Sequence, residues 1–200
     1  AIMDLTASMS GDPALEQKKM ILSGLYNLMM LNRRLNLDKY KNSMRAPLKL
    51  RSHLLSFKGD TLVSLLHKPE NEIDEKTLTD LYYELEKTMT GHGNLVGALK
   101  AYENSLKPEM LGKLKLKKMV KVLTIVSDGA VSDKPECVAA IERLRQKGIT
   151  VSGIGFGSAA QDIRVVCHDP QNPATGVVIN DVKQAVVTRH KMLAEALKKM

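Results

Sequence analysis

The chain has 200 residues, of which 44% are hydrophobic, and this is enough to bury the core of one domain. Only 4% of the residues are aromatic and tryptophan is absent, which argues against a surface that stacks nucleic-acid bases or sugars. No run reaches the roughly 18 apolar residues that a membrane-spanning helix needs, so no membrane span is predicted. The two cysteines, Cys137 and Cys167, favour buried thiols in a reducing compartment over a disulfide.

The start of the chain combines an apolar segment with a row of oxygen-bearing side chains. Ala1–Met3 is typical of the end of a buried strand rather than of a signal peptide, so we expect residues 1–200 to be one domain of a longer chain. Asp4, Thr6 and Ser8 follow at alternate positions, and an extended chain projects such residues to one side. Their oxygens suit Mg²⁺ better than zinc or copper, whereas a turn or helix cap is the competing structural explanation.

A long helix and a hairpin are predicted next. Asp12 has the residue type of an N-cap and a proline follows it, which together with the hydrophobic spacing predicts a helix over residues 13–35. Residues 36–46 are polar and irregular, as in a connection. Alternating polarity predicts a half-covered strand over residues 48–57, and residues 61–67 return antiparallel to it as the second strand of a hairpin.

Two helices flank a glycine-rich loop in the middle of the chain. Residues 75–89 and 95–106 both place apolar side chains at helical spacing. The loop between the two helices, residues 88–94, reads Thr-Met-Thr-Gly-His-Gly-Asn. Pro108 and Gly112 are expected to end the second helix or to force a short irregular connection.

The second half of the chain alternates strands and helices. Residues 120–127 are β-branched and almost continuously apolar, which predicts a central, parallel strand that leads directly into Asp128. A helix with Asp133 as its N-cap is predicted to end at Gly148. The remaining predicted elements are a strand over residues 149–156, a short helix over 159–168, a strand over 175–180 and a closing helix over 182–197.

Three glycines, Gly153, Gly155 and Gly157, fall in and just after the strand predicted over residues 149–156. Their spacing lacks the G-x-G-x-x-G pattern of a dinucleotide-binding loop. We expect them to allow close packing beside the strand.

The order of strands and covering helices predicts a three-layer α/β domain. We expect a doubly wound, Rossmann-like fold around a mostly parallel, six-stranded sheet with one antiparallel edge strand. Ligands of such sheets bind beyond the carboxyl ends of the strands. Asp4 and Asp128 each follow a predicted strand directly, so both are expected at that edge although they lie about 120 positions apart.

These motifs resemble those of a von Willebrand factor type A domain, and the resemblance covers essentially the whole chain. The matching segments are Asp4-Leu-Thr-Ala-Ser-Met9, Gly91-His-Gly-Asn-Leu95 with Ala98-Leu99, Ile125-Val-Ser-Asp-Gly129 and the segment 148–157. Domains of this family carry a metal-ion-dependent adhesion site. The resemblance implies that Thr6 and Ser8 bind Mg²⁺, or Mn²⁺, through their hydroxyls, while Asp4 and Asp128 hold its waters. A carboxylate from a partner protein would complete the octahedron.

The chain departs from the family pattern at two positions. Thr6 replaces the more usual serine and keeps the hydroxyl. More seriously, the family's Gly-Gly-Thr-Asn reads Gly-His-Gly-Asn over residues 91–94, so Gly93 stands where a threonine is expected. The candidates for the missing ligand are Thr90, Thr88, the amide of Asn94 and the imidazole of His92, which we rather expect in solvent. The alternative is a degenerate, metal-free interaction surface.

No catalytic constellation stands out in the sequence. There is no nucleophile elbow, phosphate-binding loop or zinc-hydrolase motif, and Cys167, His168 and Asp169 are adjacent residues that rarely face each other for proton transfer. The leading interpretation is a noncatalytic, cytoplasmic protein-interaction module that grips an Asp or Glu of a partner through Mg²⁺. Cytoplasmic bacterial members of the family work beside AAA+ ATPases, which makes an AAA+ ATPase a candidate partner. The alternative function is that of a subunit in an ATP-driven chelatase or a similar assembly.

The formal net charge of +8 is the last feature to explain. Part of it lies in the run Lys113–Lys118, which precedes the strongest strand and is therefore expected at the edge opposite the metal loops. A basic surface fits nucleic acid, anionic lipid or acidic proteins, and solvated lysines that keep the domain soluble are the plainer explanation. Because no nucleic-acid-binding motif accompanies the charge, we do not expect nucleic acid as a partner.

Overall fold

A computed structural model describes most of the chain. The described residues are 1–4, 12–35, 37, 50–58, 61–69, 72–87, 93–127, 131–156, 160–172, 175–178, 187, 188, 191 and 194. Most of the connection predicted over residues 36–46, the glycine-rich loop up to His92 and most of the predicted closing helix lie outside them.

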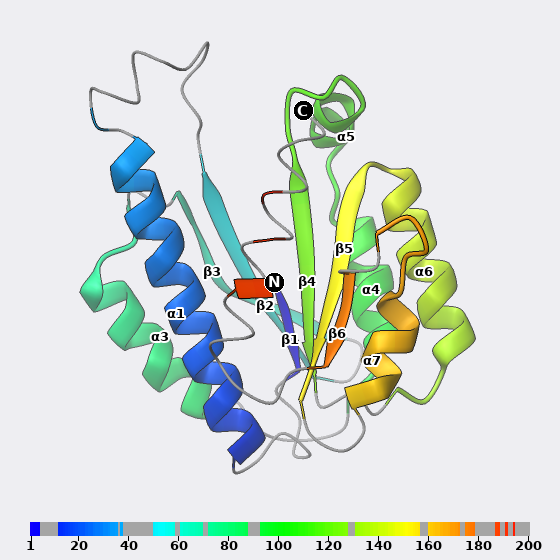
Figure 1. Cartoon of the computed structure of the whole chain (residues 1–200), viewed down its shortest axis with the longest axis horizontal. Coiled ribbons are helices and arrows are strands. Elements are labelled where there is room, and N and C mark those ends of the chain that lie inside the picture. The colour runs from blue at the N-terminus through cyan, green and yellow to red at the C-terminus, as the bar shows by residue number, and fades with distance from the viewer. Residues whose placement is uncertain are drawn as a thin grey trace.

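The strands in the described part of the chain form one six-stranded sheet in the order β3-β2-β1-β4-β5-β6 (Figure 1). Their bounds are β1 (Ile2–Asp4), β2 (Arg51–Lys58), β3 (Thr61–Pro69), β4 (Lys121–Ser127), β5 (Ile149–Gly155) and β6 (Gly176–Val178). Neighbouring strands are parallel, except that β3 pairs antiparallel with β2 at one edge. This arrangement confirms the predicted mostly parallel sheet with an antiparallel edge strand.

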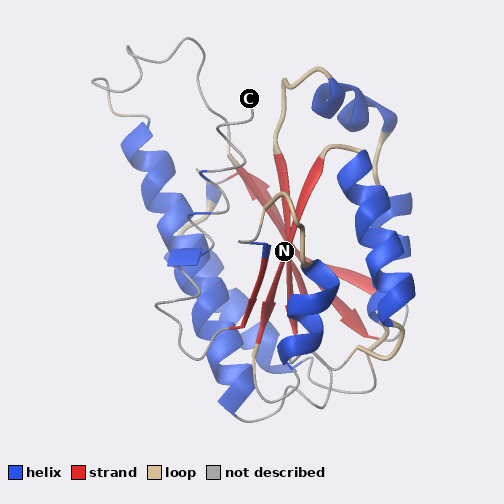
Figure 2. Ribbon diagram, turned by 45° about the vertical axis from the view of Figure 1, so that its right-hand side comes forward, coloured by secondary structure: helices blue, strands red, loops and turns tan. Residues whose placement is uncertain are grey.

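Helices cover both faces of the sheet, which confirms the predicted three-layer α/β fold (Figures 1 and 2). The helices α1 (Asp12–Leu35) and α3 (Glu75–Lys87) contribute to one apolar cluster. The other cluster contains side chains of α4 (Leu95–Asn104), α5 (Pro108–Lys115), α6 (Lys134–Gln146) and α7 (Ala160–Cys167). Within the described residues, we find no helix that combines the length and the apolar character needed to cross a bilayer.

The central strands bury side chains on both faces of the sheet. In β1, Ile2 belongs to the cluster under α4 and α6, whereas Met3 belongs to the cluster under α1. In β4, Ile125 and Val126 divide between the two clusters in the same way. Successive side chains of a strand point to opposite faces, so a strand covered on both sides must be apolar at nearly every position. This is why residues 120–127 gave the strongest strand signal.

Glycines allow α7 to lie close against β5, as the sequence predicted. A Cβ atom built on Gly153 would lie 2.5 Å from the Sγ of Cys167, and one built on Gly155 would lie 2.7 Å from the carbonyl oxygen of Ala160. Side chains at these positions would therefore push the helix away from the strand. The third glycine of the series, Gly157, lies outside the described residues.

One local prediction is wrong, and a second holds only in part. Pro108 and Gly112 do not produce an irregular connection but lie within the helix α5. Proline is compatible with the first turn of a helix because its missing N–H has no intrahelical partner there, and a single interior glycine costs only about 1 kcal/mol. Asp133 precedes α6 at the N-cap position but makes no side-chain capping hydrogen bond. Glu136, three residues after Asp133, forms an ion pair with Lys100 at 3.2 Å.

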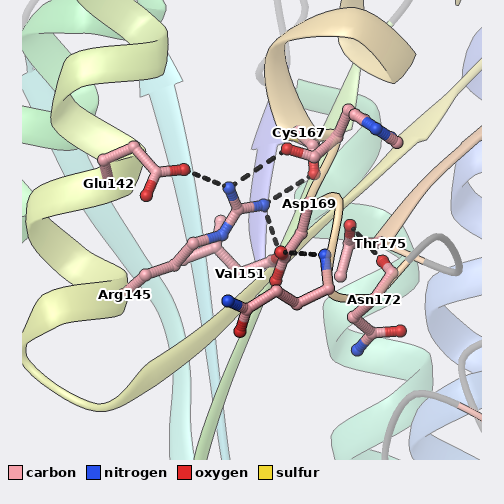
Figure 3. Close-up of polar contacts among 9 residues, drawn as sticks. Glu142, Arg145, Val151, Cys167, Asp169, Asn172 and Thr175 are labelled. Carbon is pink, nitrogen blue, oxygen red and sulfur yellow. Dashed lines mark hydrogen bonds and ion pairs between the residues drawn. The ribbon is translucent and has the colours of Figure 1, made fainter.

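The end of α7 is held by a guanidinium group from α6 (Figure 3). Arg145 donates hydrogen bonds to the carbonyl oxygens of Cys167 at 2.7 Å and His168 at 3.2 Å, and its Nη1 also contacts Glu142 at 2.5 Å. A weaker contact of 3.5 Å reaches the carbonyl oxygen of Val151 in β5. The last carbonyls of a helix have no partner within the helix, so Arg145 satisfies them and joins α6, α7 and β5.

Candidate metal site

The two strands that lead into the predicted metal loops are neighbours in the sheet. Met3 of β1 pairs with Val126 of β4, so the next step along each strand places the backbone of Asp4 beside Ser127, and Asp128 is the following residue. From β1, the strand order runs through β2 in one direction and through β4 in the other. Parallel sheets bind ligands at such a reversal, beyond the carboxyl ends of the strands. Figure 1 shows β1 and β4 ending together at the lower edge of the sheet.

The helix α4 begins beside the loop that follows β4. A small cavity of about 10 Å³ separates them, and its lining includes Gly93 and Val96 on one side and Val131 and Cys137 on the other. A space of this size holds one water molecule at most. Gly93, which stands where the family has a threonine, is thus close to a residue only three positions beyond Asp128.

Asn94 has a structural role at this end of α4. Its side-chain oxygen accepts a hydrogen bond from the backbone N–H of Gly97 at 3.0 Å, which makes it the N-cap of the helix. The predicted role of Asn94 as a metal ligand therefore competes with helix capping and stays a prediction.

Asp162, in the first turn of α7, anchors the loop that follows Asp128. Its carboxylate accepts a hydrogen bond from the N–H of Val131 at 3.4 Å and forms an ion pair with Lys134 at 2.6 Å. The hydrogen bond from Lys134 is the main reason why the pKa of Asp162 lies below its ordinary value. The sequence alone does not reveal this role of Asp162, because an acid in the first turn of a helix is common for reasons of the helix dipole alone.

Oxygen chemistry fits this edge better than thiolate chemistry. Burial, followed by the nearby carboxylates of Asp133 and Glu136, raises the pKa of Cys137 to about 11, so this thiol stays protonated at neutral pH. The described residues contain no group of three or more His, Cys, Asp and Glu side chains placed to hold a metal. The donors that the sequence predicts are hydroxyls and carboxylates, which suit a hard cation such as Mg²⁺.

The structure describes only part of the predicted ligand set. Asp4 is described through its backbone, and Asn94 through its side chain as well. The other predicted ligands, Thr6, Ser8, Thr90 and Asp128, lie outside the described residues.

The two cysteines do not form a reactive site. Both are free and buried, as the sequence predicted. Burial raises the pKa of Cys167 to about 12, although the nearby charge of Arg145 opposes this shift. The thiol is therefore protonated and inaccessible, and the neighbouring His168 and Asp169 do not make it a nucleophile.

The sequence matches no protein-family model and no curated protein, but solved structures share its fold. The manganese-loaded TRAP protein of Plasmodium vivax is 18% identical, with a TM-score of 0.57 over 96% of this chain and 72% of that chain. The pilus adhesin SpaC of Lactobacillus rhamnosus GG is 9% identical, with a TM-score of 0.62 over 96% of this chain and 30% of that one. Proximal thread matrix protein 1 of the mussel byssus, with a zinc-occupied MIDAS motif, is 16% identical. Its TM-score is 0.57 over 96% of this chain and 46% of that chain.

These similarities establish the fold. The chain spans less than half the length of the adhesin and byssus chains that it matches. It has the fold of a von Willebrand factor type A domain, as the sequence motifs indicated.

Proposed function

We propose that this chain is a noncatalytic protein-interaction domain that binds a divalent cation at the carboxyl edge of its sheet and, through that cation, an acidic side chain of a partner. The observation that carries the proposal is the pairing of β1 with β4, in register up to Met3 and Val126. Because of this pairing, β1 and β4 end side by side, one at Asp4 and the other just before Asp128, at the position where parallel sheets bind ligands.

The proposed ligands are those of the family's adhesion site. Thr6 and Ser8 would hold the cation by their hydroxyls, and Asp4 and Asp128 would hold its waters, with Thr90 or Asn94 in place of the missing threonine. The ion supplies a position that a carboxylate from a partner can occupy, and Mg²⁺ and Mn²⁺ both suit such oxygen donors. A manganese-loaded structure and a zinc-occupied structure share this fold, which supports a divalent cation here.

The partner and the cellular setting are proposed from more limited observations. The buried, protonated Cys167 gives no support to an enzyme, and an adhesin and a matrix protein share the fold. The two free thiols favour a reducing compartment, so we propose a cytoplasmic domain that occupies residues 1–200. An AAA+ ATPase or a chelatase assembly is a candidate partner through the family resemblance alone.

A capture experiment tests this function. The native-length protein is immobilised and exposed to lysate of its own organism in Mg²⁺ or in EDTA, beside an Asp4→Ala variant and a Ser132→Ala control. Ser132 is exposed and follows the same strand as Asp128, but it is not a predicted ligand. We expect the wild type and the control to retain a partner protein in Mg²⁺. EDTA should release this protein, and the Asp4→Ala variant should fail to retain it. Retention that is indifferent to both EDTA and Asp4→Ala would contradict a cation-mediated interaction.

A substitution of Gly93 distinguishes a functional metal site from the alternative, a degenerate and metal-free interaction surface. Replacing Gly93 by threonine restores the hydroxyl that the family pattern has there. If the native site is functional, the variant should bind Mg²⁺ several-fold more tightly than the wild type. A wild type that binds no metal, beside a Gly93→Thr variant that does, would identify a degenerate site.

A further inference from the structure

The lysines that account for most of the net charge gather around α5, far from the candidate metal site. The segment 107–121 contains six lysines and one glutamate, which give it +5 of the chain's +8. Figure 2 shows α5 lying across one end of the molecule, at the opposite end from the carboxyl ends of β1 and β4. We propose that this segment, here called the basic end, binds the surface of an anionic lipid bilayer.

Most charges of the basic end have no acidic partner within the part of the chain that the structure describes. Lys113 pairs with Glu109 at 2.6 Å on the exposed side of α5. The other exposed lysines of the segment form no ion pair with a described residue: Lys107, Lys115, Lys117 and Lys118. Elsewhere the lysines of α4 and α6 pair with nearby acids, as Lys100 does with Glu136 and Lys134 does with Asp162. As far as the described residues go, the charge at this end is therefore available to an anionic surface.

The positive field of the basic end extends to the neighbouring strands. The pKa of His67 in β3 lies below its ordinary value, first because of partial burial and then because of the positive charges of Arg51, Lys121 and Lys107. Arg51 and Lys121 begin the parallel strands β2 and β4, and Lys107 precedes α5, so two of these cations start strands at the edge opposite the carboxyl ends. A protein surface that approaches a bilayer gains from each cation within about a Debye length of the lipid headgroups.

An exposed apolar side chain lies among these lysines. Leu116, at the C-cap of α5, is 66% exposed, and both of its sequence neighbours are exposed lysines. The previous leucine, Leu114, is buried in the core and fixes the helix to the domain. Lys117 has φ of 54°, a left-handed backbone conformation that ends the helix and turns the chain. An apolar side chain ringed by lysines can enter the headgroup region while the ammonium groups stay at its surface.

This combination favours lipid over the other anionic partners. Single-stranded nucleic acid binds to exposed aromatic platforms, but Tyr102, an aromatic residue near this end, is 3% exposed and lies under the ammonium group of Lys121 at 5.6 Å. Neither phosphate groups nor acidic side chains of a protein would gain from Leu116. A bilayer with anionic headgroups offers a partner for the lysines and for the leucine together.

Cosedimentation with vesicles tests the proposal with the native-length protein. The vesicles are pure phosphatidylcholine or a mixture with 30% phosphatidylserine, at low and high salt. We expect binding to the anionic vesicles alone, weakened by salt. Each lysine near an anionic surface contributes about fivefold in affinity, so Lys115→Gln/Lys118→Gln should lower the partition coefficient by roughly 25-fold. Leu116→Ser should lower it several-fold at constant net charge.

Matched variants separate the basic end from charge in general. Lys76→Gln/Arg164→Gln removes the same charge from two exposed residues elsewhere, and Val165→Ser removes a similarly exposed apolar side chain from α7. Both control variants should bind the anionic vesicles with a partition coefficient within twofold of that of the wild type. Binding should also persist in EDTA and in the Asp4→Ala variant, so this result is independent of the metal site.

Three outcomes would overturn the proposal. The first is equal binding, or none, to neutral and anionic vesicles at low salt. The second is a loss in the Lys76→Gln/Arg164→Gln control as large as that in the Lys115→Gln/Lys118→Gln variant, because net charge alone would then explain binding. The third is salt-dependent binding to duplex DNA or to an acidic peptide that Leu116→Ser leaves unchanged, with weaker binding to vesicles.

Discussion

Gly155 and Gly112 show how the surroundings of a single glycine decide the effect of adding one methyl group. A Cβ atom on Gly155 would meet the backbone of Ala160, at 2.7 Å from its oxygen and 2.9 Å from its Cα. A Cβ atom on Gly112, in the interior of α5, would have no such neighbour within 4 Å. The first glycine is required by packing, whereas the second only lowers helix propensity.

Alanine at the two positions should therefore change stability in opposite directions. We expect Gly155→Ala to lower the free energy of unfolding by about 1–3 kcal/mol, because α7 must move away from β5. Gly112→Ala should raise it by about 0.5–1 kcal/mol, because alanine restricts the unfolded chain and favours the helix. Urea unfolding followed by circular dichroism measures both. A Gly155→Ala variant with an unchanged free energy of unfolding would show that α7 does not pack on β5 as described.

His53 and His67 form a stacked pair across the two strands of the hairpin. Their ring centroids are 4.4 Å apart with an interplanar angle of 19°, and the Nε2 of His53 lies 3.2 Å from the hydroxyl of Ser64. Burial lowers the pKa of His53 to about 4, helped by His67 and Lys121. Both rings are therefore expected to be neutral at pH 7, and protonating one of them places a charge against its neighbour.

This arrangement predicts a loss of stability in mild acid. Because the pKa of His53 in the folded state is lower than its ordinary 6.5, the unfolded chain binds more protons between about pH 6.5 and pH 4. The stabilisation is complete above pH 6.5 and is lost as the pH falls towards 4, by about 1–2 kcal/mol after allowance for partial exposure. Urea unfolding of the wild type and of His53→Gln at pH 7.5, 5.5 and 4.5 measures the difference. Equal pH dependence of the two proteins would contradict this account.

At the scale of the elements, α7 depends on one side chain of α6. Arg145 has a side chain only 14% exposed, and it donates to the last carbonyls of α7. Arg143, two positions away, is 44% exposed and pairs with Glu103 at 3.1 Å. Glu103 keeps a second cationic partner, Lys147, when Arg143 is removed. Loss of Arg145 would therefore leave the last carbonyl oxygens of α7 without this donor, whereas loss of Arg143 would leave Glu103 with a cationic partner.

Replacing each arginine by alanine tests this difference. Arg145→Ala leaves partly buried carbonyl oxygens without a donor and should lower the free energy of unfolding by about 2–3 kcal/mol. Arg143→Ala removes an exposed ion pair and should cost about 0.5 kcal/mol or less. Equilibrium denaturation gives both values. Equal effects would mean that Arg145 is not the link between α6, α7 and β5.

Elements with strong local signals were predicted well, and those decided by distant contacts were not. The helix α1 and the strand β4 appear where the hydrophobic spacing places them, because each buries a continuous apolar face. The helix α5 was missed because Pro108 and Gly112 are local helix breakers. Leu114 belongs to the same core as α4 and α6 and gives this segment a buried anchor, which the local sequence does not reveal.

The same division applies to the candidate site. The alternation from Asp4 to Ser8 and the strand before Asp128 were enough to predict that both loops leave one edge of the sheet. The roles of Asp162 and Asn94 could not be predicted, because anchoring and capping depend on the backbone groups that the fold brings near them. A carboxylate or an amide in a first helical turn has the same appearance in the sequence whatever it contacts.

The whole molecule places two different surfaces at opposite ends of one sheet. The carboxyl ends of β1 and β4 form the candidate metal edge, and α5 lies across the other end (Figure 1). Parallel strands produce this separation, since every loop that follows a strand lies at one edge and every loop that precedes a strand lies at the other. A domain held on a bilayer by its basic end would therefore present its metal edge to a partner away from the membrane.

Direct metal binding tests the central claim. Isothermal titration of the native-length protein with Mg²⁺ and with Mn²⁺, beside an Asp4→Ala variant whose fold is checked by circular dichroism, measures whether the carboxyl edge holds a cation. We predict that the wild type binds one divalent ion and that Asp4→Ala abolishes this binding. A wild type that binds neither ion, or a variant that binds as the wild type does, would contradict this prediction.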